Sequence, residues 1–221
     1  MPLKLHLATP SDTPTLATLF FTTFSDAFNT KLFPRAPDVH AWWARALAKD
    51  IRNPRKCLIT VVDTDADPAK DEPSIVGFAL WSLPAPVANV STTEAQSGAK
   101  SVGVEEKEEE LEDGFSAPWP ESCDATFCER FFGRNHERQV ETMGGKRYYY
   151  VDVLGTHPAA RRKGVATMMM NWGLERARQE GVEVYLSSTQ AGKLVYEKLG
   201  FEVRSTADFD GYVQDSMVWV P

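Results

Sequence analysis

The segment from Tyr148 to Ala166, which reads YYYVDVLGTHPAARRKGVA, constrains the fold of this chain more than any other. An apolar, strand-like run ends in a short loop, three consecutive cations follow at Arg161 to Lys163, and Gly164 opens a helical pattern. Small residues let a backbone approach a ligand closely, and the first N–H groups of a helix have no partner within the helix. The segment therefore predicts a strand-to-helix turn that holds an anion such as a pyrophosphate.

The composition is that of a globular protein with a substantial core, and it disfavours several classes of function. The chain has 221 residues, 43% of them hydrophobic, and a net charge of -7, which argues against a general nucleic-acid surface. No apolar run approaches a membrane span, and the opening MPLKLHLATPSD lacks the apolar core of a signal peptide. Cys57, Cys123 and Cys128 lack the spacing of a zinc site, so we expect reduced thiols, no metal and a cytoplasmic protein.

Strand and helix patterns alternate along the chain. Period-two alternation and turn signals predict strands near residues 3–7, 57–63, 74–83, 148–154, 182–188, 201–205 and 214–220. Caps and apolar spacings predict a helix from Ser11 or Asp12 to Phe24 or Phe28, and others over residues 38–50, 122–143, 164–180 and 191–199. The helix between the strands near 150 and 185 implies a right-handed parallel crossover. These patterns predict an α/β or α+β fold with a mixed sheet of about seven strands.

One segment departs from this alternation. Residues 84–120 are rich in Ser, Thr, Ala, Gly and Pro, and the run EEKEEELED at residues 105–113 has seven acidic side chains in nine. Such a composition buries too little apolar surface to offset the entropy lost on ordering. We therefore predict a single domain over residues 1–221 with a flexible acidic insertion at about 84–120. A flap or a partner-binding acidic strip is the alternative reading of that insertion.

Two short motifs lie in the C-terminal third of the chain. Arg161, Gly164 and Ala166 form the pattern Arg-x-x-Gly-x-Ala, and Tyr196 begins the element Tyr-x-x-x-Gly-Phe. Together they resemble the signature of the GNAT superfamily of acetyl-CoA-dependent N-acetyltransferases. The resemblance covers residues 148–201, about a quarter of the chain. The layout, with a long insertion before the signature strand, also resembles the puromycin-type acetyltransferases and their fungal relatives.

The resemblance implies a fold and a cofactor site. The sheet would be central, mostly antiparallel, flanked by helices, and splayed between two parallel strands at residues 148–154 and 182–187. The pantetheine arm of acetyl-CoA would enter the gap and pair with the backbone, while the following turn and its cations would hold the pyrophosphate. The cofactor-binding residues implied in this way are Leu154, Thr156, Arg161, Arg162, Lys163, Gly164, Val165, Ala166 and Thr167.

The resemblance also implies catalytic roles. Tyr196 occupies the position of a tyrosine that commonly protonates or orients the leaving thiolate, and a tyrosine with a pKa of about 10 is a neutral donor at pH 7. Asp152 lies nine residues before Arg161, on the strand face where relatives often place His or Glu. We predict that Asp152 is the base, directly or through a water. Because an ordinary Asp is a weak base for an ammonium, an electrostatic or structural role for Asp152 is the alternative.

These expectations define a function: transfer of acetyl from acetyl-CoA to a primary amine of a small molecule, by direct attack. No cysteine lies in the matching segments, which favours transfer without a covalent enzyme intermediate. The alternatives are acetylation of protein lysines or N-termini, and a non-catalytic CoA-binding regulatory module. The acceptor site is expected near residues 24–33 and 118–132, where Asp26, Asp124 and Glu129 could attract a cation. We expect a monomer or weak homodimer with no nucleic-acid or membrane partner.

Overall fold

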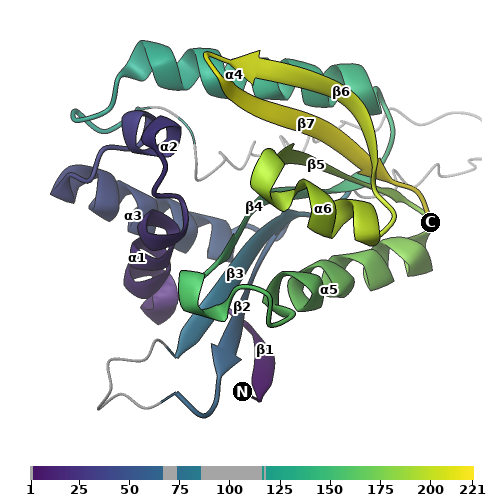
Figure 1. Cartoon of the computed structure of the whole chain (residues 1–221), viewed down its shortest axis with the longest axis horizontal. Coiled ribbons are helices and arrows are strands. Elements are labelled where there is room, and N and C mark those ends of the chain that lie inside the picture. The colour runs from purple at the N-terminus through teal and green to yellow at the C-terminus, as the bar shows by residue number, and fades with distance from the viewer. Residues whose placement is uncertain (1, 67–73, 86–115, 117) are drawn as a thin grey trace, which may run out of the picture.

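The computed structural model describes residues 2–66, 74–85, 116 and 118–221, and its core is a seven-stranded sheet with helices on both faces (Figure 1). The strand order is β1-β2-β3-β4-β5-β7-β6, and every neighbouring pair is antiparallel except β4 and β5. The mixed, mostly antiparallel α/β architecture predicted from the sequence is confirmed. The strands are β1 (Leu3–Leu7), β2 (Lys56–Asp63), β3 (Ile75–Ser82), β4 (Tyr148–Thr156), β5 (Glu183–Thr189), β6 (Glu202–Phe209) and β7 (Tyr212–Trp219).

The helices follow the predicted spans closely, apart from the region after the first one. They are α1 (Thr13–Thr23), α2 (Ala27–Leu32), α3 (Pro37–Arg52), α4 (Ala125–Met143), α5 (Val165–Glu180) and α6 (Gln190–Lys198). The sequence pattern predicted that the first helix ends at Phe24 or Phe28, but α1 ends at Thr23. Asp26 starts a separate helix, because its carboxylate accepts hydrogen bonds from the backbone and side-chain nitrogens of Asn29 at 3.0 and 2.7 Å. The six residues of α2 are too few to show helical periodicity in the sequence.

Alternate residues of the strands build two apolar layers, one on each face of the sheet. On one face, Val165 and Met169 of α5 pack with Trp81 and Val151. On the other, α1, α3 and α4 cover strand residues such as Phe78. The helices on the two faces thereby hold the sheet rigidly from both sides.

The centre of the sheet opens between β4 and β5. These parallel strands pair only from Tyr148 to Val151 and from Glu183 to Leu186, although both run further. The pairing stops at a β-bulge, where Trp81 lies opposite Val151 and Leu80 lies opposite Val153, which makes Asp152 the extra residue. A bulge bends its strand, so β4 diverges from β5 beyond this point. The splayed sheet implied by the resemblance is therefore present.

Three expectations concern features away from this opening. The predicted acidic insertion lies largely outside the described residues, at 86–115 and 117. Cys57, Cys123 and Cys128 are free thiols. In the described part of the chain, no helix is both long enough and apolar enough to cross a membrane.

Gly173 of α5 allows the helix to pack closely on the sheet, which generates a stability prediction. A Cβ atom at this position would overlap the fully buried ring of Trp81. We expect Gly173→Ala to lower the free energy of unfolding by about 1–3 kcal/mol, because overpacking outweighs the gain in helix propensity. The control is Gly133→Ala in α4, where nothing lies within 4 Å of the new methyl group. That variant should be stabilised by about 0.5–1 kcal/mol. Urea denaturation measures both, and equal shifts would contradict the packing argument.

Candidate active site

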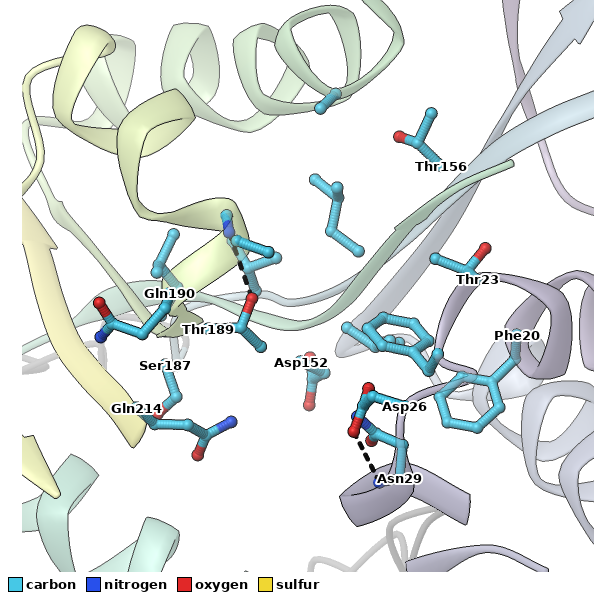
Figure 2. Close-up of a pocket in the computed structure, with 18 of the residues that line it drawn as sticks. Phe20, Thr23, Asp26, Asn29, Asp152, Thr156, Ser187, Thr189, Gln190 and Gln214 are labelled. Carbon is cyan, nitrogen blue, oxygen red and sulfur yellow. Dashed lines mark hydrogen bonds between the residues drawn. The ribbon is translucent and has the colours of Figure 1, made fainter. Parts of the chain in front are cut away.

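A cavity of about 1120 Å³ lies where β4 and β5 part (Figure 2). Its lining comes from both splayed strands, from the start of α5 and α6, and from α1, α2, α4 and β7. Elements that are far apart in the sequence therefore line the same cavity. The described residues contain no cluster of His, Cys, Asp and Glu that could hold a metal ion.

The turn from β4 to α5 forms one end of this cavity. Gly164 has a φ of 83° and Arg162 a φ of 61°, so the chain turns through the left-handed region twice before the helix begins. The first helical bond runs from the Met168 N–H to the Gly164 carbonyl, at 2.9 Å. The preceding N–H groups of α5 thus have no partner within the helix and carry the positive end of its dipole.

Most of the residues implied for cofactor binding come together at this turn. The cavity lining includes Leu154, Thr156, Arg161, Arg162, Gly164, Val165, Ala166 and Thr167. Lys163 is exposed and is not among the lining residues. The arrangement presents helix N–H groups and two guanidinium-bearing residues to an anion within one wall.

Arg161 and two threonines connect this end of the cavity to α1. The Arg161 guanidinium donates a hydrogen bond at 3.3 Å to the main-chain oxygen of Thr23, at the end of α1. The hydroxyl oxygens of Thr23 and Thr156 are buried and have no hydrogen-bond partner among the described residues. Both side chains line the cavity and are visible in Figure 2. Two unsatisfied hydroxyls facing one space indicate a site that a polar ligand completes.

Tyr196 lies in the wall formed by α6. Its ring packs edge-on against Phe201, with ring centroids 5.8 Å apart, and the absence of a side chain at Gly192 makes room for it. Burial raises the pKa of Tyr196 to about 12. Among the described residues, burial is the only influence on this pKa and no hydrogen bond contributes to it, although Tyr196 lines the cavity. Tyr196 is therefore a neutral donor available to a ligand.

A buried carboxylate anchors the helix that carries Tyr196. Asp215 of β7 is 1% exposed, forms an ion pair with Lys193 at 2.9 Å and accepts hydrogen bonds from Gln190 and Thr206. Burial raises the pKa of Asp215, but hydrogen bonds from Thr206 and Lys193 outweigh that effect and hold the pKa below its ordinary value. Because Gln190 and Lys193 belong to α6, Asp215 ties the first turn of that helix to the sheet.

Asp152, the predicted base, is held by two neighbours from other strands. Lys56 donates to one carboxylate oxygen at 2.7 Å and the Ser82 hydroxyl donates to the other at 2.8 Å. The side chains of Lys56 and Asp152 are 8% and 15% exposed, so the ion pair is largely desolvated. Asp152 lines the cavity, but both of its oxygens already accept hydrogen bonds. Its role as a base stays a prediction.

The opposite end of the cavity contains some residues expected near the acceptor and others that the sequence did not indicate. Asp26 lines it, whereas Asp124 caps α4 and Glu129 is exposed, both outside the lining. Asn29 falls within the predicted range 24–33, whereas the polar residues Asn135 and Gln214 lie outside both predicted ranges. They carry no local motif, and only the three-dimensional contact between α2, α4 and β7 brings them together.

The geometry of Asp152 generates a prediction about stability. Asp152→Asn keeps the shape of the side chain but leaves the Lys56 cation buried without its counter-ion. We expect a loss of about 2–4 kcal/mol in the free energy of unfolding at neutral pH. The matched control is Asp210→Asn, which breaks the exposed Arg130–Asp210 pair and retains a side chain that tolerates a φ of 56°. That control should change stability by less than about 1 kcal/mol. Similar losses for both variants would show that the Lys56–Asp152 pair does not stabilise the fold.

Comparisons with known proteins identify the family and the fold. Residues 14–201 match the acetyltransferase (GNAT) family. An acetyltransferase of Stachybotrys chartarum is 26% identical over 209 residues, which cover 90% of this chain and 80% of that protein. GCN5-related N-acetyltransferase 6, chloroplastic, of Arabidopsis thaliana is 34% identical over 81 residues, which cover 35% of this chain but only 28% of the plant protein.

A solved structure shows the same fold. It is described as histone acetyltransferase HPA2 and related acetyltransferase from Corynebacterium glutamicum. The superposition covers 100% of this chain and 97% of the solved chain, with a TM-score of 0.57 and 18% sequence identity. At that identity the likeness concerns the fold alone. The family match, in contrast, spans most of the chain and includes both the Gly164 turn and Tyr196. The chain belongs to the acetyltransferase (GNAT) family.

Proposed function

We propose that this protein transfers an acetyl group from acetyl-CoA to a primary amine of a small molecule. The observation that carries the proposal is the single cavity that joins the Gly164 turn to the Tyr196 hydroxyl. Family membership and relatives named as acetyltransferases support an acyltransferase activity. The aromatic side chains in the cavity wall favour a small acceptor over a peptide lying in a shallow groove.

The residues present fit acetyl-CoA. The unpaired edge of β4 beyond Val151 offers backbone groups of Leu154 and Thr156 to an amide-bearing arm, as a neighbouring strand would. The free N–H groups of Val165, Ala166 and Thr167, together with Arg161 and Arg162, suit a pyrophosphate. The unsatisfied Thr156 and Thr23 hydroxyls suit the polar groups of the arm. When bound, acetyl-CoA supplies the activated acetyl thioester.

Tyr196 is proposed to stabilise the sulfur as the thioester bond breaks. In the reaction, the amine nitrogen bonds to the acetyl carbon, the carbon–sulfur bond breaks, and a proton from the amine ends on sulfur. A hydroxyl with a pKa of about 12 does not readily transfer its proton fully to a thiolate whose conjugate acid has a pKa of roughly 8.5. It remains a good hydrogen-bond donor to that thiolate. Tyr196 thus acts as a preorganised donor to the developing negative charge.

Asp152 is proposed to act through position rather than as a direct base. A carboxylate whose two oxygens accept from Lys56 and Ser82 is poorly placed to take a proton from an ammonium ion. Its position at the bulge makes it the residue that keeps β4 bent away from β5. The amine can lose its first proton to solvent in the open cavity.

This role for Asp152 predicts how the Asp152→Asn variant behaves. Its activity should fall in proportion to the fraction of protein that is unfolded, and the pH–rate profile of the folded fraction should stay unchanged. A shifted pH–rate profile would instead identify Asp152 as a base.

The cofactor assignment predicts a graded effect at Gly164. Gly164→Ala adds left-handed backbone strain of roughly 1–2 kcal/mol, which corresponds to about tenfold weaker acetyl-CoA binding if all of it affects the bound state. Gly164→Glu adds the same strain and also places a carboxylate beside the pyrophosphate, so its affinity should fall at least about tenfold further. Isothermal titration calorimetry with acetyl-CoA measures both. Absence of binding to the parent protein, or equal binding by the two variants, would contradict the assignment.

The role of Tyr196 predicts a change in turnover rather than in affinity. Removing a hydrogen bond to a charged group costs about 1.5–3 kcal/mol, so Tyr196→Phe should lower kcat about 10- to 100-fold with little change in acetyl-CoA affinity. Because burial raises the Tyr196 pKa to about 12, the hydroxyl stays protonated and its contribution should persist from neutral pH up to about pH 10. Tyr148→Phe, outside the cavity lining, is the control. Release of free CoA with an amine acceptor is the assay, and an unchanged kcat for Tyr196→Phe would remove it from the mechanism.

A further inference from the structure

Two buried amide oxygens face the end of the cavity opposite the Gly164 turn. Gln214 of β7 is 7% exposed, and its side-chain oxygen has no hydrogen-bond partner in the described part of the chain. The side-chain oxygen of Asn135, on α4, is buried and unsatisfied in the same way. Both residues line the cavity. A buried acceptor without a donor costs about 1–3 kcal/mol, so two in one cavity indicate a ligand that supplies donors.

The backbone segments that carry Gln214 and Asn135 are held together. Arg138 is 2% exposed and donates to the main-chain oxygen of Gln214 at 3.2 Å, which fixes α4 against β7. Asn135 lies one turn before Arg138, on the face of α4 that also carries Phe131 into the cavity. The Gln214 amide lies close to the Tyr212 hydroxyl and opposes the rise in the Tyr212 pKa that burial causes.

An exposed carboxylate, Asp26, lines the same cavity. Asp26 caps α2, and the side-chain nitrogen of Asn29 donates both to Asp26, at 2.7 Å, and to the Tyr212 hydroxyl, at 3.2 Å. In Figure 2, Asp26 and Asn29 lie next to each other, and Asp152 lies between them and Gln214. A chain of hydrogen bonds links Asp26 through Asn29 to the Tyr212 hydroxyl.

The charges near this end of the cavity favour a cation. Among the described residues, no Lys, Arg or His lies within ion-pair distance of Asp26, whereas Asp152 is paired with Lys56. Arg35 lies close enough to Asp26 to interact with it electrostatically, and the buried Arg138 guanidinium donates to the main-chain oxygens of Ser205 and Gln214. Neither arginine lines the cavity, whereas His136 does. One carboxylate and two amide oxygens therefore form a set of acceptors with a net negative charge.

An ammonium ion matches this set of acceptors better than a neutral group does. It carries three N–H donors and one positive charge, and it has no acceptor that would leave an unfavourable contact with an oxygen. The aromatic wall next to the oxygens, from Phe131 and Tyr212, suits a hydrocarbon chain and can also attract a cation.

We propose that Asp26, Asn135 and Gln214 form a second-ammonium site, so that the acceptor of this enzyme is a small aliphatic diamine. One amine enters toward the thioester, the chain lies against the aromatic wall, and the far ammonium binds the three oxygens. This inference rests on the proposed acetyl transfer and deepens it by naming the substrate class. In this proposal Asp26, Asn135 and Gln214 select the substrate and take no part in the acetyl transfer itself.

The test compares acceptors of equal length that differ only in the distal group. Putrescine and cadaverine are assayed against butylamine and pentylamine, and against the matching amino alcohols, by release of free CoA. We expect kcat/KM for the preferred diamine to exceed that for its monoamine by at least about tenfold, the value of one charge-assisted hydrogen bond. Asp26→Asn and Gln214→Leu should bring the ratio of diamine to monoamine kcat/KM close to one, whatever they do to the absolute rates. Glu137→Gln, an equal charge change on the exposed side of α4, should preserve the diamine preference.

A binding measurement separates this inference from the proposed function. Calorimetry with cadaverine in the presence of CoA should show binding that weakens at least about tenfold in Asp26→Asn, while pentylamine binding changes little. If amines are acetylated with no preference for the diamines, the second-ammonium site is rejected and acetyl transfer stands. If the diamines bind through Asp26 but no amine is acetylated, the site stands and the proposed function falls. Amino alcohols that match the diamines would also reject the site, because a neutral donor would then be sufficient.

Discussion

The ion pair between Lys56 and Asp152 lies at the point where the central sheet opens, and the rest of the site depends on that opening. Asp152 is the extra residue of the bulge in β4, and Lys56 of β2 and Ser82 of β3 hold its two oxygens. Parallel pairing with β5 stops immediately before it, at Val151. A carboxylate in this buried position requires a counter-ion and hydrogen-bond donors. The Lys56–Asp152 pair therefore also determines that Asp152 is the extra residue of the bulge. Without that bend, β4 and β5 could continue to pair and would close the cavity.

The two strands that part at the bulge lead to two helices with complementary tasks. From β4 the chain passes through the left-handed Gly164 into α5, whose free N–H groups are suited to an anion. From β5 it passes directly into α6, which carries the neutral Tyr196 and is anchored by the buried Asp215. The proposed anion recognition and sulfur stabilisation are thus built on rigid elements on either side of one gap, and Gln214 of the proposed second-ammonium site is adjacent to the anchor Asp215 on β7.

Local patterns in the sequence were enough to predict the strands, the longer helices and the strand-to-helix turn at Gly164. The strand alternation, the helix periodicity of α5 and the glycine at residue 164 are all local signals, and each corresponds to an observed feature. The partners of Asp152 could not be predicted in this way, since Lys56 lies 96 residues away and joins it only through the sheet register. The same holds for Asn29 and Tyr212, which are 183 residues apart. The short helix α2 was not predicted, because its start depends on a single cap at Asp26 rather than on periodicity.

The most direct test of the central claim is a crystal structure of the protein with bound acetyl-CoA. If the opening at Asp152 creates the cofactor site, the pantetheine arm should lie between β4 and β5 beyond Val151 and Leu186, with the pyrophosphate on the Gly164 turn and the sulfur within hydrogen-bond distance of the Tyr196 hydroxyl. Acetyl-CoA bound elsewhere, or a sulfur atom remote from Tyr196, would contradict the claim.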